Sequence, residues 1–135
     1  MATSTPSLRI LLVDDHDGFL KAAVRRFRAL DWIEIAGLAH NGLEAVRLSE
    51  SLRPDAVLMD LSMPEMGGLQ ACRLIKAQDA PPFVAIVSHF DDAQHREHAA
   101  RAGADTFVSK LSYMQDVTTV LESLRERPHA EHGGE

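Results

Sequence analysis

Short apolar runs alternate with segments of helical periodicity along almost the whole chain. The apolar runs predict strands at Leu8–Val13, Ile33–Leu38, Ala56–Met59, Phe83–Val87 and Thr106–Ser109. Between them, apolar residues recur every three or four positions, as on a helix with one buried face. This repeated strand–helix order predicts an α/β domain with a doubly wound, five-stranded parallel sheet and helices on both faces.

Turn and capping residues mark the ends of the predicted helices. Asn41 and Glu44 match a capping box, and Gly103 stands where a glycine commonly ends a helix. The Ile33–Leu38 strand alternates apolar and polar residues, which is typical of a half-exposed edge strand. The predicted helices cover His16–Leu30, the segment from Asn41 to just before Pro54, the segment after Gly67 and Gly68, Asp92–Ala102, and Ser112–Arg125.

Polar residues follow the predicted strands at the points where those strands end. Asp14 and Asp15 come after the first strand, Asp60 after the third, Ser88 after the fourth and Lys110 after the fifth. The carboxyl ends of parallel strands meet at one edge of the sheet, where ligands bind. Because clustered carboxylates need a cation to relieve their repulsion, the pattern predicts a site for a divalent metal and an oxyanion.

The composition excludes several classes of function. A chain of 135 residues, 45% hydrophobic and 25% charged, is typical of one globular domain. The net charge of −6 argues against direct nucleic-acid binding, which needs a basic surface. The single cysteine, Cys72, allows no intramolecular disulfide, and no apolar stretch is long enough to span a membrane. We therefore expect a soluble, cytoplasmic domain over residues 8–125, between disordered segments at 1–7 and 126–135.

Five sequence segments together point to a known family. The chain resembles the receiver domain of two-component response regulators from about Leu8 to Leu124. The resemblance is closest to the subgroup that usually carries a C-terminal helix-turn-helix output domain, which these 135 residues do not include. The matching segments are LLVDDH at Leu11–His16, LMDLSMPEMGGL at Leu58–Leu69, Val87-Ser88, AGAD at Ala102–Asp105 and FVSK at Phe107–Lys110.

The resemblance implies a fold, a function and a set of partners. The fold is the flavodoxin-like receiver fold with strand order 2-1-3-4-5. Asp60 is implied to accept a phosphoryl group from a sensor histidine kinase or phosphotransfer protein. The chain is then a signalling phosphoacceptor and not an enzyme. It would pass its signal by contact with an unknown downstream protein or output domain, and phosphorylation would favour a homodimer.

The resemblance also implies roles for the residues around Asp60. Asp14, Asp15 and Asp60, with the backbone carbonyl of Ser62, correspond to the ligands of Mg²⁺. Ser88 and Lys110 correspond to the hydroxyl and ammonium groups that bind the phosphoryl oxygens. Phe107 corresponds to an aromatic residue that changes rotamer on activation, entering space that Ser88 vacates. Half-buried packing on an edge strand explains Phe107 almost equally well.

The sequence departs from the family pattern near the site. Leu111 follows Lys110, where many receivers have proline, and we expect a trans peptide bond there because a non-proline cis bond costs about 3 kcal/mol. Gly67 stands where an aspartate is common. His89 and Phe90 add bulk that would crowd access to Asp60.

Two other functions are weighed against phosphorylation. A receiver-like interaction module that works without phosphorylation is favoured by the bulk of His89, but the complete acidic pocket with Lys110 weighs against it. A flavodoxin-like cofactor binder is disfavoured because no Gly, Ser or Thr loop that could cradle a phosphate follows the first strand.

Other conspicuous residues have simpler explanations. His16 is expected near the metal but solvated instead of ligating. His95 and His98 share a predicted helix face without further ligands, so a solvated helix explains them best. Cys72 has helical spacing from apolar neighbours and is expected in the core.

Overall fold

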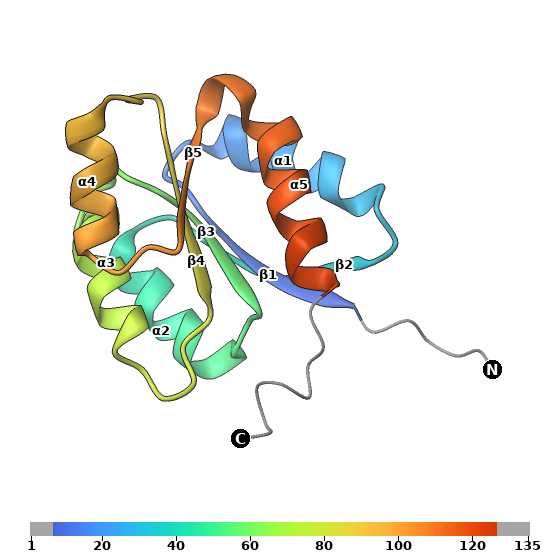
Figure 1. The fold of residues 1–135 in the computed structure, drawn as a ribbon. Coiled ribbons are helices and arrows are strands. Elements are labelled where there is room, and N and C mark those ends of the chain that lie inside the picture. The colour runs from blue at the N-terminus through green and yellow to red at the C-terminus, as the bar shows by residue number, and fades with distance from the viewer. Residues whose placement is uncertain (1–6, 127–135) are drawn as a thin grey trace.

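Five parallel strands form one sheet in the order β2-β1-β3-β4-β5, as seen in the computed structural model, which describes residues 7–126 (Figure 1). The expected strand order is confirmed. The expectation of disorder at 1–7 and 126–135 falls outside the described residues except at Ser7 and Glu126, and Glu126 donates its backbone N–H to the Glu122 carbonyl. The strands are β1 (Leu8–Val13), β2 (Ile33–Ala39), β3 (Ala56–Asp60), β4 (Phe83–Ser88) and β5 (Thr106–Ser109).

Helices cover both faces of the sheet, as the alternating pattern predicts. Helices α1 and α5 lie on one face, and α2, α3 and α4 lie on the other (Figure 1). Among the described residues, no helix is long and apolar enough to cross a membrane. The helices are α1 (Asp17–Arg28), α2 (Gly42–Leu52), α3 (Gly68–Lys76), α4 (Ala93–Arg101) and α5 (Tyr113–Arg125), with a short 3₁₀ helix, η1 (Lys110–Ser112), before α5.

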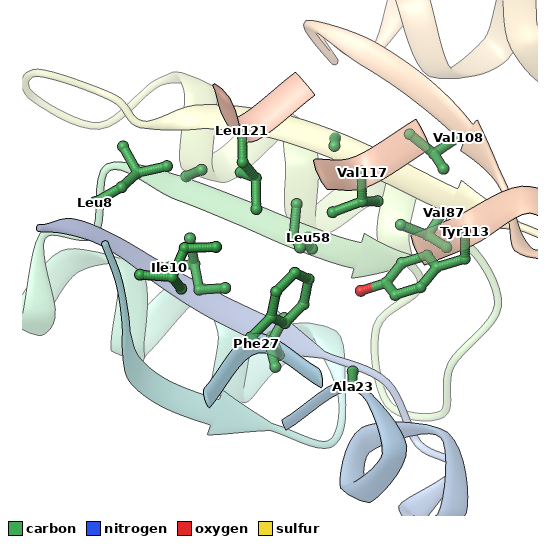
Figure 2. Close-up of a cluster of buried hydrophobic side chains, with 14 of the residues drawn as sticks. Leu8, Ile10, Ala23, Phe27, Leu58, Val87, Val108, Tyr113, Val117 and Leu121 are labelled. Carbon is green, nitrogen blue, oxygen red and sulfur yellow. The ribbon is translucent and has the colours of Figure 1, made fainter. Parts of the chain in front are cut away.

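Each central strand contributes side chains to two hydrophobic cores. In β1, Ile10 and Leu12 face α1 and α5, while Leu11 and Val13 face the other helices. Figure 2 shows the first core, in which Phe27 of α1 lies against the sheet beneath α5. Because both faces are covered, β3 and β4 are apolar up to their last residue and β1 is apolar apart from Arg9, whereas the edge strand β2 is partly exposed as expected. Cys72 is fully buried in the second core, as predicted.

Helix ends follow the expected chemistry, with one difference. The Asn41 side chain accepts a hydrogen bond from the Glu44 backbone N–H at 2.8 Å. The Glu44 carboxylate, however, accepts from the N–H of His40 at 2.7 Å, so the predicted reciprocal capping box is wrong. Asn41 is fully extended, with φ −159° and ψ 171°, and the glutamate therefore reaches one residue beyond it.

Gly103 ends α4 as predicted. Its φ of +96° lies in the region that favours glycine. The N–H of Gly103 donates to the Ala100 carbonyl, and that of Ala104 donates to the Ala99 carbonyl, each at 3.0 Å. These two hydrogen bonds form a Schellman motif, which satisfies carbonyl groups at the end of the helix.

A close backbone approach at Gly68 holds the end of β3 against the start of α3. The Gly68 N–H donates to the Leu61 carbonyl at 2.8 Å. A Cβ atom at Gly68 would lie 2.3 Å from the Asp60 carbonyl oxygen, a contact that the backbone cannot accommodate without moving. The position of Asp60 therefore depends on the absence of a side chain at residue 68.

We predict that Gly68→Ala lowers the free energy of unfolding by about 2 kcal/mol, the scale of an overpacked core site. Gly18→Ala is the control, because a Cβ atom there meets nothing within 4 Å and alanine favours a helix by up to about 1 kcal/mol. Urea unfolding followed by the fluorescence of the buried Trp32 measures both changes. Equal stability of the two variants would contradict the prediction.

Candidate functional site

The carboxyl ends of β1, β3 and β5 bring three charged side chains together. Asp14 follows β1, Asp60 is the last residue of β3, and Lys110 follows β5. The Lys110 ammonium lies 2.8 Å from Asp14 Oδ2 and 3.0 Å from Asp60 Oδ1. All three side chains are almost fully buried. The strand-end pattern in the sequence therefore predicts a real cluster, which we call the acidic crevice: Asp14, Asp15, His16, Asp60 and Lys110.

Burial and charge act in opposite directions on the ionisable groups of the acidic crevice. Burial, followed by the negative charge of Asp14, raises the pKa of Asp60 above its ordinary value, although Lys110 opposes this shift. Burial alone would lower the pKa of Lys110, but its hydrogen bonds to Asp14 and Asp60 outweigh that effect and raise it. Lys110 is therefore charged, and one ammonium group faces several carboxylates.

An aromatic ring supports Lys110 from the side of α1. The Lys110 nitrogen lies 4.3 Å from the centre of the Phe19 ring, which is a cation–π contact. Phe19 in turn packs edge-on against Tyr113, with 4.8 Å between ring centres. Phe19 was not predicted from the sequence as part of the site. Its only signal is an aromatic residue early in the helix that follows the acidic pair.

His16 lies beside the acidic pair, close to the expected metal site. Its side chain is 67% exposed, which agrees with a solvated residue. Its Nδ1 atom nevertheless faces the carboxylates, 3.1 Å from Asp14 Oδ1 and 3.3 Å from Asp15 Oδ1. Potential ligand atoms of Asp14, Asp15, His16 and Asp60 all lie within 4.8 Å of one another, and this is the one such group found among residues 7–126.

Ser88 and Phe107 lie on β4 and β5, the two strands that follow β3 in the sheet, and each has a contact of its own in this structure. Ser88 is buried at the end of β4, and its hydroxyl oxygen accepts the Phe90 backbone N–H at 2.9 Å. Phe107 is half-buried in β5, and the Arg96 guanidinium stacks over its ring at 4.8 Å. Arg96 is held by an ion pair with Asp91 at 2.5 Å. The outer face of Phe107 is therefore covered by a charged group from α4.

The loops after β4 and β5 contain residues at which this chain departs from the family pattern. No cis peptide bond occurs among the described residues, so the bond between Lys110 and Leu111 is trans, as expected. Leu111 is 87% exposed, and its N–H donates to the Ser109 hydroxyl at 3.1 Å. His89 and Phe90 are exposed, with Phe90 stacked on His95 at 5.0 Å between ring centres. The bulk of these two residues therefore lies at the exposed surface just beyond the end of β4.

Comparison with known proteins identifies the kind of domain that carries this crevice. Residues 10–122 match the family model of the response regulator receiver domain. The chain belongs to this family. It is similar to the signal receiver domain of the response regulator NarL from Mycobacterium tuberculosis, with 28% identity, a TM-score of 0.83, and coverage of 90% of this chain and 99% of that one. A LuxR-family response regulator from Aurantimonas shares 29% identity and a TM-score of 0.82, covering 88% of this chain and 85% of that one.

Two curated relatives are longer than this receiver domain. The transcriptional regulatory protein YhcZ of Bacillus subtilis is 34% identical over 95% of this chain and 56% of its own length. A protein-glutamate methylesterase/protein-glutamine glutaminase of Alkalilimnicola ehrlichii is 35% identical over 94% of this chain and 33% of its own length. The chain thus spans about half of the first relative and a third of the second.

The donor set of this receiver domain fits a divalent cation. Carboxylate oxygens are the ligands that Mg²⁺ prefers, and it is usually bound through one or two carboxylates with retained waters. Asp14, Asp15 and Asp60 provide such groups within 4.8 Å of one another. Lys110 neutralises only part of their charge. The exposed side of the cluster, at Asp15, leaves solvent access for an ion.

We predict that Asp60→Asn stabilises the metal-free protein at neutral pH. Because the folded-state pKa of Asp60 is raised, the ionised carboxylate is less stable in the folded than in the unfolded protein. This cost is complete above the folded-state pKa. It disappears as the pH falls to the unfolded value of about 3.9, because wild-type Asp60 is then protonated.

Urea unfolding across this pH range in the presence of a chelator measures the effect. The stability gain of Asp60→Asn should shrink as the pH falls. Asp79→Asn, which removes an exposed carboxylate, controls for net charge. A gain that is the same for both variants, or that does not depend on pH, would contradict the prediction.

Proposed function

We propose that this receiver domain accepts a phosphoryl group on Asp60 and thereby switches a protein-interaction surface. The observation that carries the proposal is the buried Asp60 carboxylate, 3.0 Å from the Lys110 ammonium and beside Asp14. A structural salt bridge requires one carboxylate and one ammonium. The additional carboxylates at the same strand ends are costly for the fold unless a cation or phosphoryl chemistry uses them.

The proposed reaction is a nucleophilic displacement at phosphorus. An Asp60 carboxylate oxygen forms a bond to phosphorus while the bond from phosphorus to the donor breaks, and the donor group leaves with the electron pair. Lys110 binds one phosphoryl oxygen as a positive point charge, and the Ser88 hydroxyl donates to another. Mg²⁺, bound by Asp14, Asp15, Asp60 and the Ser62 carbonyl, would neutralise charge on the phosphoryl oxygens.

The natural donor is proposed to be the phosphohistidine of a sensor kinase or phosphotransfer protein. The chain itself would be a signalling component with no substrate other than this phosphoryl group. Its downstream partner would be another protein or an output domain, which accords with the greater length of the curated relatives. We place this exchange in the cytoplasm, since the fold needs no disulfide.

The switch is proposed to involve Ser88 and Phe107. A phosphoryl group adds nearly two negative charges, which attract the Ser88 hydroxyl toward Asp60. Ser88 would then release the Phe90 N–H, and Phe107 would turn into the vacated space and leave Arg96. The surface formed by α4, β5 and α5 changes as a result, and a partner or a second copy of the domain binds there.

The phosphorylation-independent alternative has little support. The bulk of His89 favours it slightly, whereas the acidic crevice with Lys110 in contact with Asp14 and Asp60 weighs against it. No contact described for the acidic crevice favours a purely structural role over phosphoryl binding.

We predict that acetyl phosphate adds one phosphoryl group to the wild-type protein in the presence of Mg²⁺. Asp60→Asn and the omission of Mg²⁺ should each abolish the gain in intact mass, because they remove the nucleophile and the neutralising cation. Asp79→Asn should behave as wild type. If a folded wild-type protein gains no mass with Mg²⁺, the proposed function is wrong.

A second prediction separates phosphorylation from switching. Ser88→Ala should still accept the phosphoryl group but should lose the amide chemical-shift changes at Phe107 and along α4, because the hydroxyl that couples them is missing. NMR spectra before and after phosphorylation measure this. Ser51→Ala, at an exposed position of α2, is the control. Wild-type shift changes in Ser88→Ala would exclude the proposed coupling.

A further inference from the structure

His16 adds an imidazole nitrogen to a cluster that otherwise offers oxygen ligands. Its Nδ1 atom lies among the carboxylates of the acidic crevice although most of its ring is exposed to solvent. The Asp14 carboxylate holds the residue from two sides, because Asp14 Oδ1 also accepts the His16 backbone N–H at 2.9 Å. Contacts of Asp14 with both the backbone N–H and the ring nitrogen of His16 therefore hold the ring next to the carboxylates.

The spacing of these atoms matches the edge of an octahedral metal site. Bonds of about 2.1 Å at right angles place neighbouring ligand atoms roughly 3 Å apart. His16 Nδ1 lies 3.1 Å from Asp14 Oδ1 and 3.3 Å from Asp15 Oδ1. The same ion could thus contact the imidazole and both carboxylates without a large movement of the backbone.

The geometry points to His16 as a direct nitrogen ligand of the divalent cation in the acidic crevice. The inference rests on the proposed function, since it concerns the cation that this function requires. Mg²⁺ prefers oxygen ligands, whereas imidazole favours first-row transition ions. The acidic crevice of this chain should therefore select a transition dication, such as Mn²⁺ or Co²⁺, over Mg²⁺ more strongly than an all-oxygen site would.

The competing explanation is a hydrogen bond. A protonated Nδ1 would donate to the carboxylates at the same distances, and His16 would then only compensate charge. The two explanations differ in one respect that can be measured directly: only a ligand nitrogen shares unpaired electron density with a paramagnetic ion.

Pulsed electron paramagnetic resonance of the untagged protein with less than one equivalent of Mn²⁺ tests the inference. In the wild-type protein, the nitrogen of a coordinated imidazole should modulate the electron-spin signal of Mn²⁺, and His16→Gln should lose this modulation. His40→Gln is the matched control, because His40 is also an exposed histidine beside carboxylates but lies outside the cluster. Modulation that is absent in wild type, or that persists in His16→Gln, overturns the inference.

Titration calorimetry gives a second, independent readout. His16→Gln should weaken Co²⁺ binding by about tenfold or more, because even the loss of a residue that only supports a ligand costs at least that much, while Mg²⁺ binding changes less than about twofold. An equal loss for both ions would overturn the inference. Binding of Mn²⁺ without a nitrogen signal contradicts only the role of His16. Binding of neither ion contradicts the cation site itself, and phosphorylation of Asp60 is scored separately by mass.

Discussion

The ion pairs of Lys110 with Asp14 and Asp60 are the interaction on which the rest of the site depends. Two carboxylates buried at the ends of adjacent strands repel each other, and burial removes the water that would screen them. Lys110 lies 96 residues from Asp14 in sequence, yet its ammonium contacts both carboxylates. Lys110 follows β5, which lies two strands beyond β3 in the sheet, and its long side chain extends to both carboxylates. The charge balance of the site therefore depends on the strand order, because the strand order sets how far Lys110 lies from the two carboxylates.

The helical layers also contribute to this arrangement. On one face, Tyr113 of α5 packs against Phe19 of α1, and Phe19 lies against the Lys110 ammonium. On the other face, Gly68 lets α3 approach the Asp60 carbonyl closely enough to fix the end of β3. Lys110 is thus positioned from the first core and Asp60 from the second. Substitutions in either core are therefore expected to alter the positions of the side chains in the acidic crevice.

Much of this could be predicted from the sequence, because the relevant signals are local. Continuous apolar runs identify buried strands, and polar residues directly after them must gather at one edge of a parallel sheet. The contacts that could not be predicted depend on side-chain rotamers and on distances between elements far apart in the chain. Phe19 under Lys110, Arg96 over Phe107 and the ring of His16 among the carboxylates are of this kind. The hydrogen bond of the Glu44 carboxylate also could not be predicted, although its partner is close in sequence. The extended backbone of Asn41 places the His40 N–H within reach of the carboxylate.

The charge balance of the acidic crevice explains why a cation and a phosphoryl group would depend on each other. Lys110 divides one positive charge between Asp14 and Asp60, so the unmodified site already has an excess of negative charge once Asp15 is included. A phosphoryl group on Asp60 would add to that excess and draw Lys110 away from Asp14. Asp14 would then lie next to Asp15 without its ammonium partner, a state that is unfavourable unless a divalent cation is bound. The proposed dependence of phosphorylation on a cation would thus follow from having one lysine for three carboxylates.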